Sequence, residues 1–156
     1  METTLAARED AATILKLYEL RQEPVLRRAR TWMGDEFWPT SAEEIRVVIN
    51  DFGSETNCWF RQVTGYWEMA AALVNHGILA QELFVDANSE PFFLAAKFWP
   101  YLQEIRTQSP TFLMQLEKLM ERSASGRQKF EYMQASTKRR MAARRAAPMP
   151  EVQRPD

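Results

Sequence analysis

Residues 58–77 constrain the fold of this 156-residue chain more than any other stretch. They are the most apolar and aromatic part of the sequence, and their apolar positions recur at intervals of three and four residues, as on a helix. Gly77 closes the stretch and is typical of the residue that follows a helix C-terminus. We therefore predict one buried helix over residues 55–76, with the rest of the chain packed around it.

Several other segments have helical spacing, and prolines mark some of their boundaries. A proline lacks an amide donor and clashes with the preceding turn, so Pro24 and Pro100 are expected to start, end or kink helices. Ser41 and Glu44 have the spacing of a capping box. No segment alternates as a strand would. We predict an all-α fold, a compact bundle of five to seven helices around the buried central helix, with helices over 3–22, 24–33, 45–52, 81–85 and 92–106 and a last one starting at 109–110.

The two ends of the chain differ in charge. Residues 1–126 hold 12 Lys and Arg against 18 Asp and Glu, a net of −6, whereas residues 127–156 hold 8 against 3, a net of +5. After Ala135 apolar residues stop recurring and prolines accumulate. We predict a helical domain over 1–134 and a basic, proline-containing flexible tail over 135–156. Ser123 to Gly126 are expected to be a weak point, and a helix that continues to about Arg145 stays an alternative.

The chain has one cysteine, which cannot form an intrachain disulfide, so a reducing compartment is expected. Charged residues interrupt the first 23 positions, and the longest fully apolar run, Met69 to Val74, is far too short to span a membrane. We predict a cytoplasmic protein.

Cys58 and His76 are the obvious candidates for a nucleophile and a base. Both lie on the predicted central helix, 18 residues apart, which at a rise of about 1.5 Å per residue separates them by roughly 27 Å. A continuous helix thus excludes a catalytic dyad within one chain. We expect Cys58 to be inert and His76, with Asn75, to cap the helix C-terminus. A metal site is not predicted, because His76 has no second histidine and no suitably spaced acid.

Glu68 is the acid that stands out, because it lies among aromatic residues on the central helix. It shares an arc of this helix with small residues, which would let a second helix approach closely, and a buried carboxylate requires a partner. The favoured interpretation is a structural ion pair, with Arg27, Arg46 or Arg106, or an exposed acid. The alternative is a ligand contact or general base in an interhelical pocket, whose candidate polar residues are Glu68, Tyr66, His76, Asn75 and Arg61.

A basic cluster near the C-terminus is a candidate for contact with an anion. It lacks interleaved aromatic residues, and the acidic body would repel nucleic acid, so we favour a solubilising tail or a weak intermolecular contact over nucleic-acid binding. Its members are Lys138, Arg139, Arg140, Arg144 and Arg145.

The sequence contains no glycine-rich phosphate loop and no Glu-x-x-His pair for a di-iron bundle, and its single histidine does not belong to a convincing hydrolase triad. No catalytic residue and no cofactor are predicted. Eighteen aromatic residues are many for one small core, so some are expected at an interface between copies. The best hypothesis is a non-enzymatic interaction or regulatory module that forms a homo-oligomer. A small-molecule-binding or enzymatic domain with a pocket around Glu68 is the first alternative, and nucleic-acid binding through the basic tail is the second.

The central helix and its surroundings also resemble a family of uncharacterised bacterial all-helical domains. The resemblance covers about residues 15–122 and rests on Tyr66-Trp67-Glu68-Met69-Ala70, Asn75-His76-Gly77-Ile78-Leu79, Phe98-Trp99-Pro100 and Leu116-Glu117-Lys118-Leu119. Some relatives carry a membrane helix before this domain, and we expect none here. The resemblance implies a compact helical domain and adds no catalytic residue.

Overall fold

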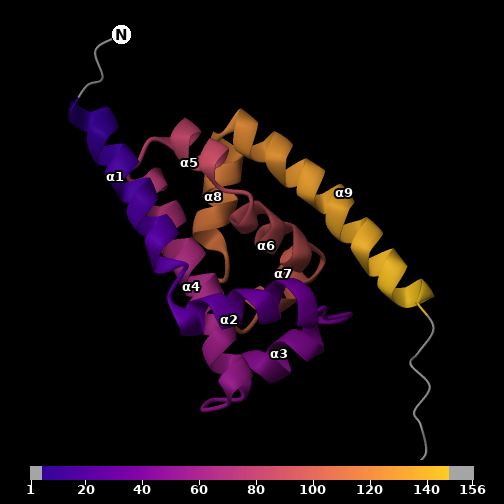
Figure 1. Ribbon diagram of the computed structural model, residues 1–156. Helices are drawn as coiled ribbons and strands as arrows, with labels where there is room; N and C mark the ends of the chain where they lie inside the picture. Colours follow the sequence, from indigo (N-terminus) through magenta and orange to yellow (C-terminus); the bar gives the residue numbers. More distant parts are fainter. Residues whose placement is uncertain (1–4, 148–156) are drawn as a thin grey trace, which may run out of the picture.

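The computed structural model describes residues 5–147, with side chains from Arg8 onward, and all regular structure in this part is helical (Figure 1). This confirms the all-α prediction. Short turns divide the described chain into more helices than predicted. A 3₁₀ turn, Trp99–Tyr101, separates two helices within 92–106, at the boundary or kink expected at Pro100. The α-helices are α1 Leu5–Leu20, α2 Pro24–Thr31, α3 Ala42–Asn50, α4 Glu55–Asn75, α5 Gln81–Ala87, α6 Glu90–Phe98, α7 Leu102–Arg106, α8 Met114–Arg122 and α9 Ala124–Ala146.

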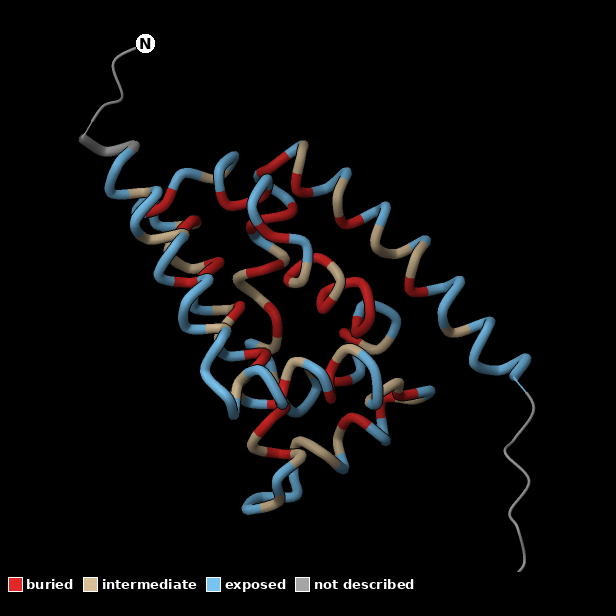
Figure 2. Tube along the Cα trace, viewed as in Figure 1, coloured by how far each residue is buried: buried red, intermediate tan, exposed pale blue. Residues whose placement is uncertain are grey.

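The helix α4 is the buried centre of the bundle, as predicted, and its start and end follow local signals. Ser54 caps its first turn by accepting from the amide of Asn57 at 3.1 Å, and Gly77 ends it with a φ of +71°, a conformation that favours glycine. Helices α2, α3 and α8 pack against it. Figure 2 shows the buried residues gathered along the inner sides of these helices.

Other predicted boundaries also have their expected causes. Pro24 is the first residue of α2. The Ser41 hydroxyl accepts from the amide of Glu44, and the Glu44 carboxylate accepts from the amide of Thr40 at 2.7 Å, which together form a variant of the predicted capping box.

The helix expected to start at Ser109 and Pro110 starts later, so this prediction was wrong. Residues 109–113 form turns, and α8 begins at Met114. Leu113, just before it, has a φ of +52°, a left-handed conformation that no helix can continue through. The local signal of serine followed by proline was outweighed by a partner from α4, described below.

The last described helix, α9, corrects the expectation of a disordered segment from 135. It runs unbroken through 124–146, so the alternative of a helix to about Arg145 describes this part, and the expected boundary at 134/135 lies inside it. Ser123 is its cap rather than a weak point, because its hydroxyl accepts from the Gly126 amide at 2.9 Å. Residues 148–156 of the predicted flexible tail lie outside the described residues. Helix α9 lies across α6 and reaches the corner of the molecule opposite the start of α1 (Figure 1).

Most of the large aromatic residues are in the core. Trp67, Phe84, Phe92 and Phe98 are fully buried, and Phe60 stacks on the ring of Phe112 with centroids 5.9 Å apart. Among the described helices, none is long and apolar enough to cross a membrane.

Candidate functional site

Glu68 binds the backbone at the start of α8. Its two carboxylate oxygens accept from the amides of Gln115 at 3.0 Å and Leu116 at 2.9 Å, which are among the first amides of this helix and have no partner within it. Burial raises the pKa of Glu68, while these hydrogen bonds and the charge of Arg106 lower it in part. Of the three arginines expected as partners, Arg106 is therefore the one that acts on Glu68, and it does so without a direct hydrogen bond.

Asn75 and Arg61, two further candidates on α4, also have structural partners. The amide of Asn75 donates to the carbonyl of Gln115 at 2.9 Å, so it joins α4 to the same turn of α8 that Glu68 binds. Arg61 is exposed and donates to the side chain of Asn57 at 3.0 Å, one turn before it on the same helix.

Tyr66 and His76 do not lie beside Glu68. The Tyr66 hydroxyl donates to the carbonyl of Leu17 and so attaches α1 to α4, and burial raises the pKa of Tyr66 to about 12. His76 is exposed at the C-terminus of α4, where its backbone amide donates to the carbonyl of Ala72. The central helix is continuous, so Cys58, which is free and half-buried, stays far from His76.

The space beside Glu68 is a cavity of about 320 Å³, open to solvent. Its wall is the turn that leads into α8, including the left-handed Leu113. Each Glu68 oxygen accepts from one backbone amide, so the carboxylate holds this turn at the start of α8.

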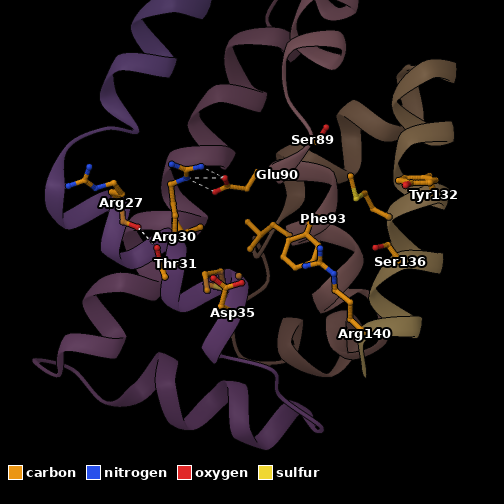
Figure 3. Close-up of a pocket in the computed structure, with 15 residues that line it drawn as sticks. Arg27, Arg30, Thr31, Asp35, Ser89, Glu90, Phe93, Tyr132, Ser136 and Arg140 are labelled. Carbon is orange, nitrogen blue, oxygen red and sulfur yellow. Dashed lines mark hydrogen bonds and ion pairs between the residues drawn. The ribbon is translucent and has the colours of Figure 1, made fainter. Parts of the chain in front are cut away.

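A larger groove, of about 470 Å³, lies elsewhere, between α2 and α9 (Figure 3). Helix α6 forms its floor, and a π-helical turn after α2, Trp32–Glu36, completes one wall. Helix α9 contributes Tyr132, Met133, Ser136 and Arg140 to the opposite wall. The other lining residues are Arg27, Arg30, Thr31, Met33, Gly34, Asp35, Val63, Ser89, Glu90, Phe93 and Leu94.

An ion pair lies at one side of this groove. The Nε and a terminal nitrogen of Arg30 donate to both oxygens of Glu90, at 2.6 to 2.9 Å, and Glu90 also accepts from the indole Nε1 of Trp67 at 3.1 Å. The hydrogen bond with Glu90 raises the pKa of Arg30. The pair has no net charge and joins α2, α4 and α6, so we infer that it holds these helices in place around the groove.

A cluster of cations and aromatic rings borders the other side, and its members Phe93 and Arg140 line the groove. The guanidinium carbon of Arg140 lies 5.4 Å from the centroid of the Phe93 ring, and that of Arg144 lies 5.0 Å from the Trp38 ring. Both arginines extend from α9 onto rings that belong to the body of the domain. Arg144 also donates to the carbonyl of Asp35.

Lys97, on α6, lies beneath the same rings and is only 2% exposed. Its Nζ donates to the carbonyl of Met33 and lies 4.5 Å from the Trp38 ring centroid and 5.8 Å from that of Phe93. Burial, followed by the positive charge of Arg144, lowers the pKa of Lys97 to about 7, against a smaller opposite effect of Asp35. This amine therefore changes its charge near neutral pH.

The basic cluster predicted near the C-terminus is divided by the helix. All side chains of this cluster are exposed, but Arg140 and Arg144 lie over aromatic rings of the body. Lys138 and Arg139 make no hydrogen bond or ion pair with the described side chains. Within residues 8–147 no group of three or more His, Cys, Asp or Glu side chains is placed to hold a metal ion.

Sequence reasoning missed both the ion pair and Lys97. Arg30 and Glu90 are 60 residues apart, and nothing local marks them as partners. Lys97 did have a signal, because it is the one charged residue in the otherwise apolar run from Pro91 to Trp99. Lysine is almost never fully buried, so its position on this apolar helix marks it as unusual.

The fold and the groove define a class: an all-helical domain with a groove between α2 and α9, which the C-terminal helix α9 helps to form. Residues 6–123 match the model of DUF4760, a domain of unknown function, and the chain belongs to this family. The match covers nearly the same residues as the resemblance noted in the sequence, and it ends one residue before α9 begins. No curated protein and no solved structure matches the chain.

Proposed function

We propose that this domain is a non-enzymatic binding module that recognises the anionic group of a small amphipathic ligand in the groove between α2, α6 and α9. One observation carries the proposal. Two cationic side chains, Arg140 and Arg144, and the titratable amine of Lys97 converge on Trp38 and Phe93, and the carboxylate of Asp35 acts on Lys97.

The excess of positive charge among the residues around the groove favours the binding of an anion. The Arg30–Glu90 pair adds no net charge, and Arg27 points away from the groove (Figure 3). Arg140 forms no ion pair with the side chains of residues 8–147. A guanidinium that lies on an aromatic ring keeps its N–H edge available for a carboxylate or phosphate, which it binds with two parallel hydrogen bonds.

The rest of the groove suits a ligand with an apolar body. Its volume of about 470 Å³ is within the range of small-molecule sites, roughly 300–1,000 Å³. Phe93 and Met133 provide apolar surface, and Ser89 and Ser136 provide hydroxyl groups that orient polar substituents. A free inorganic anion would leave this apolar surface unused.

A binding role is favoured over a catalytic one by the residues that line the groove. Neither His76 nor Cys58 is among them, and Glu90 is engaged by Arg30 and Trp67. Asp35 is the remaining acid in the lining, and no activated nucleophile lies beside it there.

The test is direct binding of anionic probes to the full chain, with benzoate, octanoate and phenyl phosphate measured by calorimetry and by NMR chemical-shift changes. We expect at least one probe to bind, with shifts at Phe93 and Ser136. Arg140→Gln should weaken its binding at least tenfold, because a charge-assisted bidentate contact is lost.

Arg139→Gln is the matched control, since it removes the same charge from the neighbouring exposed position of α9. It should change the affinity less than twofold. Equal losses of affinity in the two variants would show that only general electrostatic attraction acts, and would contradict the proposal. Failure of every probe to bind at millimolar concentration would also contradict it.

Self-association is a second candidate function, favoured by a different observation. Large apolar side chains are exposed at the end of α1 and the start of α2, namely Leu15, Tyr18, Leu20 and Val25. Light scattering should detect a dimer that Leu15→Glu abolishes, and a strict monomer at high concentration would contradict this proposal. Both candidates assume the bacterial, cytoplasmic setting that we propose from the resemblance and the single cysteine.

A further inference from the structure

The structure assigns Lys97 a part in the anion site, and we propose that it takes up a proton when the anion of the ligand enters the groove. This inference rests on the proposed function and adds a coupling to it: the groove binds an anion and a proton together. Lys97 then stabilises the bound ligand by its positive charge, although it is buried and does not touch the ligand.

The geometry places Lys97 close to the anion position without exposing it. Its Nζ lies 5.8 Å from the centroid of the Phe93 ring, and the Arg140 guanidinium lies 5.4 Å from the same centroid, so at most about 11 Å separates the two cationic centres. Phe93 and Met33, which Lys97 contacts, both line the groove. An anion bound by Arg140 is therefore within reach of the electrostatic field of Lys97.

The groups that face Lys97 determine which charge it carries. Arg140 and Arg144 from α9 repel its proton, and Asp35 from the turn after α2 attracts it. The remaining neighbours are the carbonyl of Met33 and the faces of Phe37, Trp38 and Phe93, which are uncharged. Without a bound anion, burial and then the repulsion by these arginines outweigh the attraction of Asp35, so at pH 8 the amine is mostly neutral.

A bound anion reverses this balance. It neutralises Arg140 in part and attracts a proton to the amine, which then forms an ammonium ion over the ring of Trp38, 4.5 Å away. The proton comes from solvent, so the reaction is neutral lysine plus ligand anion plus one proton giving the bound ion pair. With Lys97 buried and at most about 11 Å from Arg140, the pKa of Lys97 is expected to rise by about one unit.

The experiment measures proton uptake during binding of benzoate, whose carboxyl group stays ionised throughout the pH range used. Calorimetry of the full chain at pH 7.5 in two buffers of different ionisation enthalpy, PIPES and Tris, gives the number of protons bound per ligand. We expect about half a proton, and an affinity that falls nearly tenfold from pH 6 to pH 9. Octanoate repeats the measurement if it binds more tightly.

Lys97→Met tests the assignment, because methionine occupies a similar volume and cannot titrate. It should bind benzoate with no proton uptake and with an affinity that hardly changes with pH. Proton uptake that persists in this variant would overturn the inference.

A direct measurement on the unmodified chain keeps the inference testable even if Lys97→Met does not fold. The ¹³Cε resonance of Lys97, followed by NMR against pH, should titrate at a higher pH with benzoate than without it. An unchanged titration with benzoate bound would overturn the inference and leave the proposed function intact. If no anionic probe binds at all, the proposed function fails and this inference fails with it.

Discussion

Lys97 is a residue whose burial costs stability at neutral pH. Its folded-state pKa of about 7 lies below the ordinary value of 10.5, so between these values the unfolded chain binds a proton that the folded chain does not. The free energy of unfolding should therefore rise with pH from about 7 to 9.5 and be lowest below pH 7. Urea denaturation of the unliganded protein across this range measures the effect.

The same reasoning predicts that Lys97→Met stabilises the domain. At pH 7 the variant no longer pays for burying an amine that the unfolded chain protonates, and we expect an increase of about 2 kcal/mol in the free energy of unfolding, reduced by the lost hydrogen bond to Met33. The pH dependence between 7 and 9.5 should flatten. Lower stability of the variant at every pH would show that the hydrogen bond and ring contacts of Lys97 outweigh its burial.

Glu90 is the residue on which the groove depends structurally, because it binds Arg30 and Trp67 together. Glu90→Ala should cost about 2–3 kcal/mol, since it leaves the guanidinium and the indole without their acceptor at a partly buried site. Glu90→Gln, which keeps an acceptor oxygen, should cost less.

Glu19→Ala is the control, because Glu19 pairs with Lys16 on the surface of α1, where both side chains are more than 60% exposed. Pairs of this kind contribute little, so a change below about 0.5 kcal/mol is expected in the same denaturation experiment. Equal costs for Glu19→Ala and Glu90→Ala would contradict the role given to Glu90.

At the scale of helices, α8 depends on a side chain 47 residues away from its first turn. Glu68→Ala removes the acceptor of the Gln115 and Leu116 amides, and we expect a loss of about 1–2 kcal/mol together with faster hydrogen exchange at these two amides. Glu121→Ala, at an exposed position of the same helix, should leave both unchanged. Unaltered hydrogen exchange in Glu68→Ala would show that the first turn of α8 is stable without Glu68.

The starts of the helices show how much of the fold could be predicted from the sequence. The starts of α2, α3 and α4 depend on residues within a few positions, Pro24, Ser41 and Ser54, so local patterns locate them. The start of α8 depends on Glu68, a tertiary partner, so the local signal at Ser109 misplaced it. Predicting the groove would have required the packing of α2, α6 and α9 around α4, since its residues come from four distant segments. Only Lys97 had a local signal, a lone charge among apolar residues.

At the scale of the whole molecule, α9 lies outside the family match and yet forms one wall of the groove. Its first half is fixed by Phe130, which is buried and packs on Trp99 with ring centroids 4.8 Å apart. Its second half is polar, and apart from the buried Thr137 it is attached mainly through Arg140 and Arg144. The two halves are thus held by different forces, and only the second half carries the proposed anion contact.

Removing the charges of Arg140 and Arg144 together should therefore loosen the second half alone. In Arg140→Gln/Arg144→Gln, hydrogen exchange should accelerate in residues 138–146, because both contacts with aromatic rings are lost, and should stay slow in residues 126–134, which Phe130 holds. Lys138→Gln/Arg139→Gln removes the same charge from exposed positions and serves as the control. If both double variants exchange alike, helix propensity rather than contact with the family domain holds α9 in place, and the groove has no fixed second wall.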